Sequence, residues 1–195
     1  MREKTFGFGF DYFFDSSRQM ATKRIGHKKF WNIVVHWFAS WGIAWSVLFL
    51  GGQYLPFYLQ LFLVICKLVI CIAQEPPAGF AYSLGYCLIG YHAVLSENNG
   101  TVLLAAIAIP VCFAIQILSH IVFEGIQSLE RFTKGEDLLF QFCDMLNEFL
   151  MGEFHFSLLL VMRLDLLPVL QWRSDVDLRK IMDKVSIIKH GRKAP

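Results

Sequence analysis

The feature that most constrains the fold is a succession of apolar stretches, each of about 20 residues and each ended by residues that favour turns. A helix of about 20 residues crosses the roughly 30 Å hydrocarbon core of a bilayer, where every backbone polar group must be satisfied internally. The chain is 55% hydrophobic and 17% charged, which is too apolar for a soluble domain with a polar shell. Four such stretches predict four transmembrane helices, at residues 30–50, 55–73, 78–95 and 101–123.

A fifth apolar stretch, residues 149–170, differs from the others because charged residues interrupt it. Glu153, Arg163 and Asp165 are costly in lipid, and Pro168 cannot continue a helix. We therefore expect an interfacial or re-entrant helix here rather than a full span. The sequence thus predicts an all-α integral membrane protein with four transmembrane helices and an interfacial or re-entrant C-terminal helix.

Basic residues gather at the two ends of the chain, before residue 30 and after Gln171. Cytoplasmic segments of membrane proteins carry such an excess of Lys and Arg, so we expect both termini in the cytoplasm and an even number of spans. Residues 1–170 are expected to form a single membrane domain, and residues 171–195 a basic cytoplasmic tail. The last four residues, Arg-Lys-Ala-Pro, are similar to a dibasic retrieval signal, which predicts a multi-pass protein of the endoplasmic reticulum membrane.

Histidines near the ends of the predicted helices are the most informative polar residues, because ionisable groups at membrane depth are costly and mark functional sites. His27 and His36 lie at the cytoplasmic end of the first span, and His120 lies at the end of the fourth, which returns to the same membrane face. His120 and Glu124 are four residues apart, so an imidazole and a carboxylate share one helix face. This spacing is compatible with a shared metal ion or with an ordinary intrahelical ion pair.

The separation of His27 from His36 places a condition on any shared metal site. The two residues are nine positions apart, so on one unbroken helix they would point in opposite directions. If both bind one metal ion, the helix must begin after His27, near Phe30. His92, near the opposite end of the third span, is expected to be an interfacial anchor, and His155 has no predicted role.

Two spaced patterns in these segments resemble a known family, the membrane-embedded, iron(II)-dependent 2-hydroxy fatty acid dioxygenases of the endoplasmic reticulum. The patterns are His27-x4-Asn32-x3-His36 and Gln116-x3-His120-x3-Glu124. The similarity covers about residues 13–167. The chain resembles a divergent member, because Ser119 stands where the family usually has glycine and residues 127–129 lack the usual Pro-Ala-Leu.

The resemblance implies an oxidoreductase that uses O₂ to remove the carboxyl carbon of a 2-hydroxy long-chain fatty acid, a step of fatty acid alpha-oxidation, at the cytoplasmic membrane face. It implies Fe(II) as the cofactor, which histidines with open coordination positions suit. The implied metal ligands are His27, His36 and His120. Glu124 would serve catalysis as a fourth ligand or as an acceptor beside the ligands, and Asn32 and Gln116 would orient the ligands.

The resemblance also indicates how such a substrate would lie. Its acyl tail would lie between apolar helices of the bilayer while its polar head reaches the metal. Lys28, Lys29 and Arg131 are candidates, by position alone, to balance the substrate carboxylate.

A second hypothesis is a non-catalytic membrane scaffold or lipid-binding subunit, in which the polar clusters at the helix ends are structural. In that case the segment 125–147 would bind a partner through apolar residues at helical spacing. These residues are Leu138, Leu139, Phe142, Met145 and Leu146. A transporter is less favoured because the polar groups gather at one face, whereas transport sites lie near the midplane. No nucleic-acid partner is expected.

Overall fold

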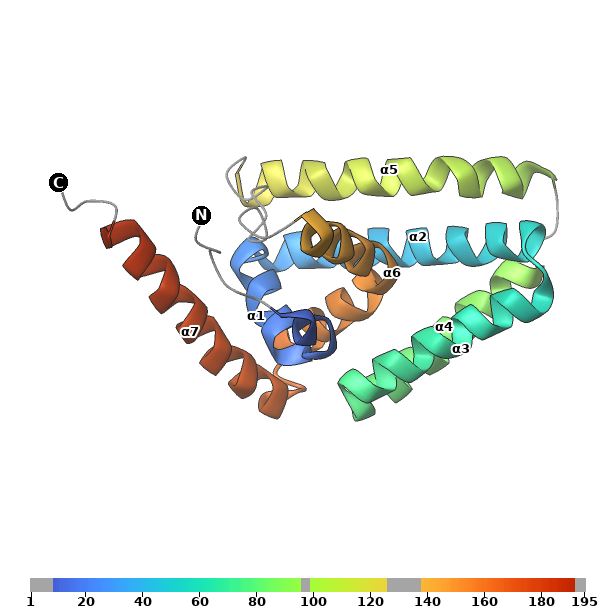
Figure 1. Ribbon diagram of the computed structural model, residues 1–195. Helices are drawn as coiled ribbons and strands as arrows, with labels where there is room; N and C mark the ends of the chain where they lie inside the picture. Colours follow the sequence, from blue (N-terminus) through green and yellow to red (C-terminus); the bar gives the residue numbers. More distant parts are fainter. Residues whose placement is uncertain (1–8, 96–98, 126–137, 192–195) are drawn as a thin grey trace.

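The computed structural model describes residues 9–95, 99–125 and 138–191, and in these ranges every regular element is a helix (Figure 1). In chain order the elements are η1 (Phe10–Phe14), α1 (Ser16–Gly26), α2 (Phe30–Tyr54), α3 (Phe57–Gln74), α4 (Pro76–Leu95), α5 (Asn99–Phe123), α6 (Leu138–Arg163) and α7 (Pro168–Gly191). Among the described residues five helices, α2 to α6, are long and apolar enough to cross a membrane. The predicted all-α architecture with membrane-spanning helices is therefore supported, although five helices qualify by length and apolarity where four were predicted.

Helices α2 and α5 lie side by side and run in opposite directions (Figure 1). They approach closely at Gly42, where an added Cβ would lie 3.0 Å from the Sγ atom of Cys112. A residue without a side chain therefore favours this contact. Because the two helices are antiparallel, the end of α5 returns to the beginning of α2, which brings His120 to the level of His36.

Helices α3 and α4 form a second antiparallel pair, set obliquely to α2 (Figure 1). The connection is short, because α3 ends at Gln74 and α4 begins at Pro76, a residue suited to the first turn of a helix. At Gly79 an added Cβ would lie 2.5 Å from the carbonyl oxygen of Cys71, so this close approach of the two backbones requires glycine.

Helix α6 packs across α2 and is seen nearly end-on in Figure 1. Near its beginning, the ring of Phe140 lies 5.7 Å from that of Tyr12 in η1. At its end, Arg163 donates to the main-chain oxygen of His27 at 3.3 Å, just beyond α1. Both ends of α6 therefore lie on the side of the molecule where η1 and α1 lie.

The predicted bounds of this element, residues 149–170, were wrong, because α6 is one continuous helix over Leu138–Arg163. Glu153 interrupts the apolar sequence but not the helix. Its carboxylate forms an ion pair with Lys67 of α3 and accepts a hydrogen bond from Tyr82 of α4 at 2.8 Å. The charge is satisfied by the protein, so it does not force the helix to end there.

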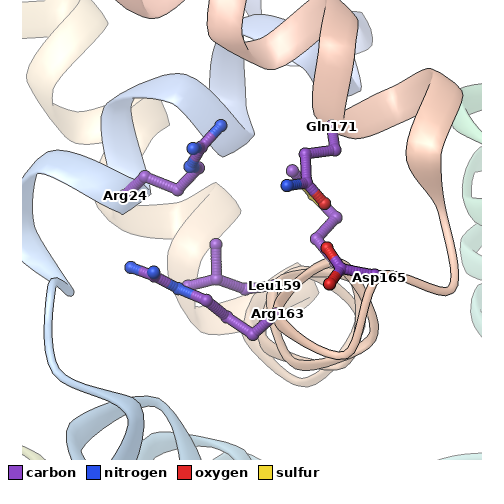
Figure 2. A pocket seen from close by; sticks show the side chains of 6 residues that line it. Arg24, Leu159, Arg163, Asp165 and Gln171 are labelled. Carbon is purple, nitrogen blue, oxygen red and sulfur yellow. The ribbon is translucent and has the colours of Figure 1, made fainter.

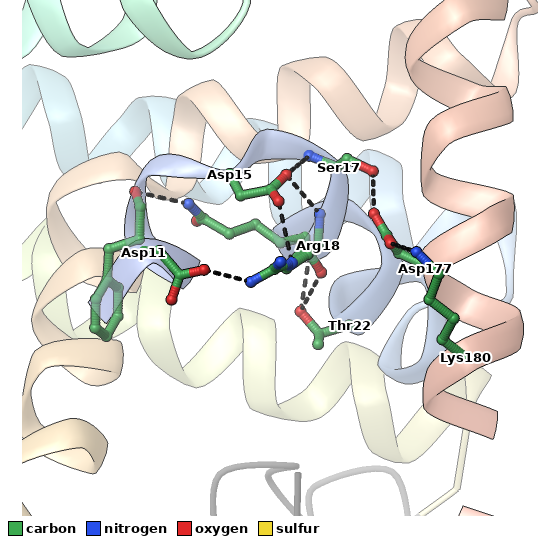
Figure 3. A network of polar contacts seen from close by, with 9 residues as sticks. Asp11, Asp15, Ser17, Arg18, Thr22, Asp177 and Lys180 are labelled. Carbon is green, nitrogen blue, oxygen red and sulfur yellow. Dashed lines mark hydrogen bonds and ion pairs between the residues drawn. The ribbon is translucent and has the colours of Figure 1, made fainter. Parts of the chain in front are cut away.

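The break comes instead at Asp165, whose φ of 57° lies in the left-handed region, shortly before α7 begins at Pro168. Much of the expected tail, residues 171–195, belongs to α7, which packs on α1. In the polar network of Figure 3, Ser17 donates to Asp177 of α7 at 2.5 Å. These contacts fix α1 between the membrane-compatible helices and the C-terminal helix.

Candidate metal centre

His27 lies in the short link between two helices. Helix α1 ends at Gly26 with His27 as its C-cap, and α2 begins at Phe30. The condition set by the sequence, a helix that begins after His27 near Phe30, is confirmed. Because the helix is interrupted at this link, the side chains of His27 and His36 need not point in opposite directions, as they would on one continuous helix.

His27, His36 and His120 come together in what we call the histidine centre. The ring centroids of His27 lie 4.6 Å from those of both His36 and His120, and the centroids of His36 and His120 are 4.7 Å apart. One ligand nitrogen of each residue lies within 4.8 Å of the others. His27 and His36 are buried, and His120 is partly buried. Two patterns distant in the sequence therefore meet at one point.

The nitrogens of the histidine centre are poorly satisfied by the protein. The Nδ1 atom of His27 lies 2.9 Å from the carbonyl oxygen of Lys23, and since a carbonyl only accepts, Nδ1 carries the proton. That leaves the lone pair on Nε2 of His27, which has no hydrogen-bond partner among the described residues, and neither has either ring nitrogen of His36. Buried polar atoms are almost always hydrogen-bonded, so these orphaned nitrogens fit a metal ion.

Burial also keeps His27 in the form that binds metals. Desolvation, followed by the effect of the neighbouring His120, lowers the pKa of His27 to about 3. The imidazole is therefore neutral at physiological pH, with a lone pair available to a cation.

Asn32 connects the elements around His120. Its Nδ2 lies 3.5 Å from Nδ1 of His120 and 3.5 Å from Oε1 of Glu124, and its Oδ1 accepts from the hydroxyl of Ser119 at 2.6 Å. Ser119, which replaces the glycine of the resembling family, thus takes part in the network. Asn32 therefore lies beside His120, and its role in orienting a metal ligand stays a prediction.

Glu124 is not one of the group of three ligand-bearing residues. Its Oε1 accepts from the main-chain N–H of Lys29 at 2.6 Å, at the start of α2. A carboxylate is favourable there because the first N–H groups of a helix lack partners. Of the two expected roles, this position fits the acceptor beside the ligands.

Gln116 lies one turn before His120 on α5, and it contacts a residue that the sequence did not suggest. Its side-chain amide donates to the hydroxyl of Ser40 on α2 at 3.0 Å. This hydrogen bond joins α5 to α2 and does not involve a histidine.

Helix α6 contributes a residue that sequence reasoning missed. The ring of Phe156 packs against His27 at 5.0 Å and against His36 at 4.7 Å. The ammonium group of Lys23 lies over the same ring, 5.3 Å from the centroid of Phe156. Lys23 also forms an ion pair with Glu148 at 3.5 Å. An apolar ring and a cation therefore border the histidine centre.

Arg163 supports the link that carries His27. Its guanidinium donates to the main-chain oxygens of His27 at 3.3 Å and Lys28 at 3.1 Å. Figure 2 shows Arg163 and Arg24 on one side of a cavity of about 150 Å³, with Asp165 on the other. The cavity lies where α1, α6 and the start of α7 meet.

The remaining sequence candidates lie elsewhere. His92 accepts from Nε1 of Trp45 at 3.2 Å, away from the histidine centre. Lys28 and Lys29 are exposed, and Arg131 lies outside the described residues. His155 is fully buried on α6, without a hydrogen-bond partner in the described part of the chain, and it does not belong to the group of three.

A second polar group, which we call the Lys67 cluster, was missed at the sequence level. It consists of Lys67, Tyr82, Tyr86 and Glu153. Lys67 pairs with Glu153, and its ammonium group lies 4.4 Å from the ring centroid of Tyr86. The signal was present, because Lys67 is a single charge inside the second apolar stretch and such a charge requires a partner.

The fold and the site together define an all-helical protein with membrane-compatible helices and a buried centre of three histidines. The chain matches no protein-family model, and searches among curated proteins and solved structures find no similar protein. The resemblance to the dioxygenases therefore rests on the two spaced patterns and on the residues that they contain.

Proposed function

We propose that the chain is a membrane-embedded, iron(II)-dependent dioxygenase that removes the carboxyl carbon of a 2-hydroxy long-chain fatty acid. The observation that carries the proposal is the convergence of His27, His36 and His120, with ligand nitrogens within 4.8 Å of one another. Three of their buried nitrogens have no partner within the described protein. Such nitrogens suit Fe(II), which when bound would supply O₂ activation at coordination positions left open by the protein.

The protein's own residues would prepare the centre for a metal. The Lys23 carbonyl fixes the tautomer of His27, and Asn32 with Ser119 orients His120. Glu124 joins the end of α5 to the start of α2. Residues that orient metal ligands raise metal affinity, and they do so here by holding three separate segments in one geometry.

Lys23 is a better candidate than Lys28 or Lys29 to balance the substrate carboxylate, and it would do so by exchanging its present ion-pair partner, Glu148, for the substrate. Its side chain is only 11% exposed, and its ammonium group lies over Phe156, the ring that contacts both His27 and His36. Lys28 and Lys29 point to the exterior. A 2-hydroxy acid offers a hydroxyl and a carboxylate to the centre, and a nearby cation would favour that anion over a neutral lipid.

We further propose that α2 to α5 span the bilayer and that α6 is interfacial or re-entrant. Its contacts at both ends are with η1 and with the link after α1, on one side of the molecule. Four spans also keep the basic N-terminal and C-terminal segments on the same side, which the positive-inside rule requires. The histidine centre would then lie near the cytoplasmic face, and the C-terminal dibasic residues would favour retrieval to the endoplasmic reticulum.

The proposal is tested by metal analysis and turnover of the purified protein reconstituted with Fe(II). We expect iron in the wild type, and its loss together with turnover of a 2-hydroxy long-chain acid in His36→Ala and His120→Ala. His92→Ala is the matched control, because His92 bonds Trp45 away from the centre, and it should retain both. A folded wild-type protein that takes up no iron, or a His36→Ala variant that keeps it, refutes the proposal.

The scaffold hypothesis predicts the opposite result for the same variants. The first turn of α6 exposes Leu138, Leu139 and Phe142, an apolar surface that a partner would cover. In a scaffold, substitution of these residues disrupts a complex, whereas His36→Ala leaves function intact.

A further inference from the structure

A cavity with a predominantly apolar lining lies between α2, α3, α6 and η1. Its volume is about 540 Å³, within the range of roughly 300–1,000 Å³ that is typical of small-molecule sites. Val47 and Leu48 of α2, Leu63 and Val64 of α3, and Leu150 of α6 are among the residues that line it. Several of them, including Leu63, are also partly exposed, so the cavity opens at the side of the helices.

The cavity is elongated along the proposed spans. On α2 its lining extends from Ile43 to Leu55, which is about 18 Å at a rise of about 1.5 Å per residue. At the other end it is bordered by the aromatic rings of η1, such as Phe13. This shape suits an extended hydrocarbon chain rather than a compact ligand.

Two charged side chains line the cavity without presenting an unpaired charge to it. Lys67 and Glu153 form an ion pair, and Glu153 also accepts from Tyr82 at 2.8 Å. The ammonium group of Lys67 additionally lies against the ring of Tyr86. Because these charges neutralise one another, the wall of the cavity attracts an apolar chain more than a free charged headgroup.

A small void of about 10 Å³ lies next to the cavity, on the side of Phe156. Ile43, Phe149 and Glu153 line both spaces, so they form the boundary between them. The void is also lined by Phe156, whose ring contacts His27 and His36. Phe156 therefore separates His27 and His36 from the void, and the void borders the apolar cavity.

We propose that this cavity binds the hydrocarbon chain of the substrate, and that Ile43 and Phe149 form the constriction through which the chain reaches the histidine centre. The identity of the polar end rests on the proposed function, whereas occupation of the cavity by a single acyl chain is measurable without turnover. The lateral opening lets the chain enter from the bilayer. The lining extends as far as Leu55 and Gln60, which sets the length of chain that the cavity can cover.

The test measures binding of radiolabelled 2-hydroxyhexadecanoic acid to the full chain in a maltoside detergent, with iron content determined on the same samples. Val47→Trp and Leu63→Trp fill the cavity and should weaken binding about tenfold or more, since overpacking an apolar site is unfavourable. Both variants should retain wild-type iron. Leu84→Trp on α4 is the matched control, because Leu84 is exposed and does not line the cavity, and it should bind normally.

Chain length sharpens the test. An eight-carbon 2-hydroxy acid, which leaves the far part of the cavity empty, should be affected less by Leu63→Trp than the sixteen-carbon acid. Binding within twofold of wild type in both folded cavity variants overturns the inference, as does a co-purified phospholipid that the acid fails to displace. Normal acid binding without iron uptake overturns the proposed function instead and leaves the chain site standing.

Discussion

The histidine centre and the Lys67 cluster are both buried polar groups between apolar helices, but they are completed in different ways. In the Lys67 cluster each charge has a partner of the same chain, since Lys67 meets Glu153 and Glu153 also meets Tyr82. In the histidine centre like groups face one another, and the nitrogens of His36 have no partner among the described residues. The first arrangement is complete as protein, whereas the second leaves buried nitrogens without partners in the described part of the chain, which the proposed metal ion would supply.

The largest effect on stability is expected from removing one partner of the ion pair in the Lys67 cluster. Glu153→Leu leaves Lys67, whose side chain is only 15% exposed, without its partner, which should lower the free energy of unfolding by about 3–5 kcal/mol. The measurement is unfolding in detergent, with circular dichroism as the probe. The double variant Lys67→Met/Glu153→Leu is the control and should recover most of the loss, and a single variant as stable as the double one would contradict the assignment.

A smaller effect is expected from the residue that orients His120. Asn32→Ala removes the contacts of the Asn32 side chain with Ser119 and His120, and loss of such an orienting residue lowers metal affinity about 10- to 100-fold. Titration with Fe(II) under anaerobic conditions measures the affinity. Ser46→Ala, which removes only a hydroxyl bonded to its own helix, should leave it unchanged. Equal affinities in wild type and Asn32→Ala would show that Asn32 serves only helix packing.

The smallest expected effect is on the stability of the metal-free protein, and its sign is opposite to that expected for Glu153→Leu. In metal-free protein His36→Leu replaces unpartnered buried nitrogens by an apolar group, so stability should stay the same or rise by about 1 kcal/mol. Unfolding with chelator present measures it. Added Fe(II) should then stabilise the wild type and not the variant. A strongly destabilised metal-free variant would indicate that His36 is a structural residue, like Glu153.

Much of this arrangement was predictable from the sequence, because hydropathy and spacing are local properties. The apolar stretches predicted helices close to α2 through α5, and the nine-residue separation of His27 and His36 predicted the start of α2 near Phe30. Because successive spans run in opposite directions, the fourth was predicted to end at the membrane face where the first begins, which places His120 at the level of His36. Each of these inferences needs only the period of a helix and the thickness of a bilayer.

The rest depends on contacts between distant segments. Helix α6 was predicted too short because Glu153 reads as a break until its pairing with Lys67 is known. Phe156 carries no sequence signal of its own, since it lies beside the histidines only because α6 crosses α2. Helix α7 was expected as a tail because its sequence is polar, and its packing on α1 depends on specific partners such as Ser17 and Asp177.

The histidines of the centre come from two parts of the sequence that lie far apart, and this determines the order in which they can come together during synthesis. Asn32 and His120, which meet in the folded protein, are separated by 88 residues of sequence. During synthesis the first two histidines emerge long before the third, so no ion can be held by all three until α5 has inserted beside α2. Helix α6, which brings Phe156 over His27 and His36, follows later still. Under the proposed function, metal delivery would therefore be a late step that follows the packing of α5 against α2.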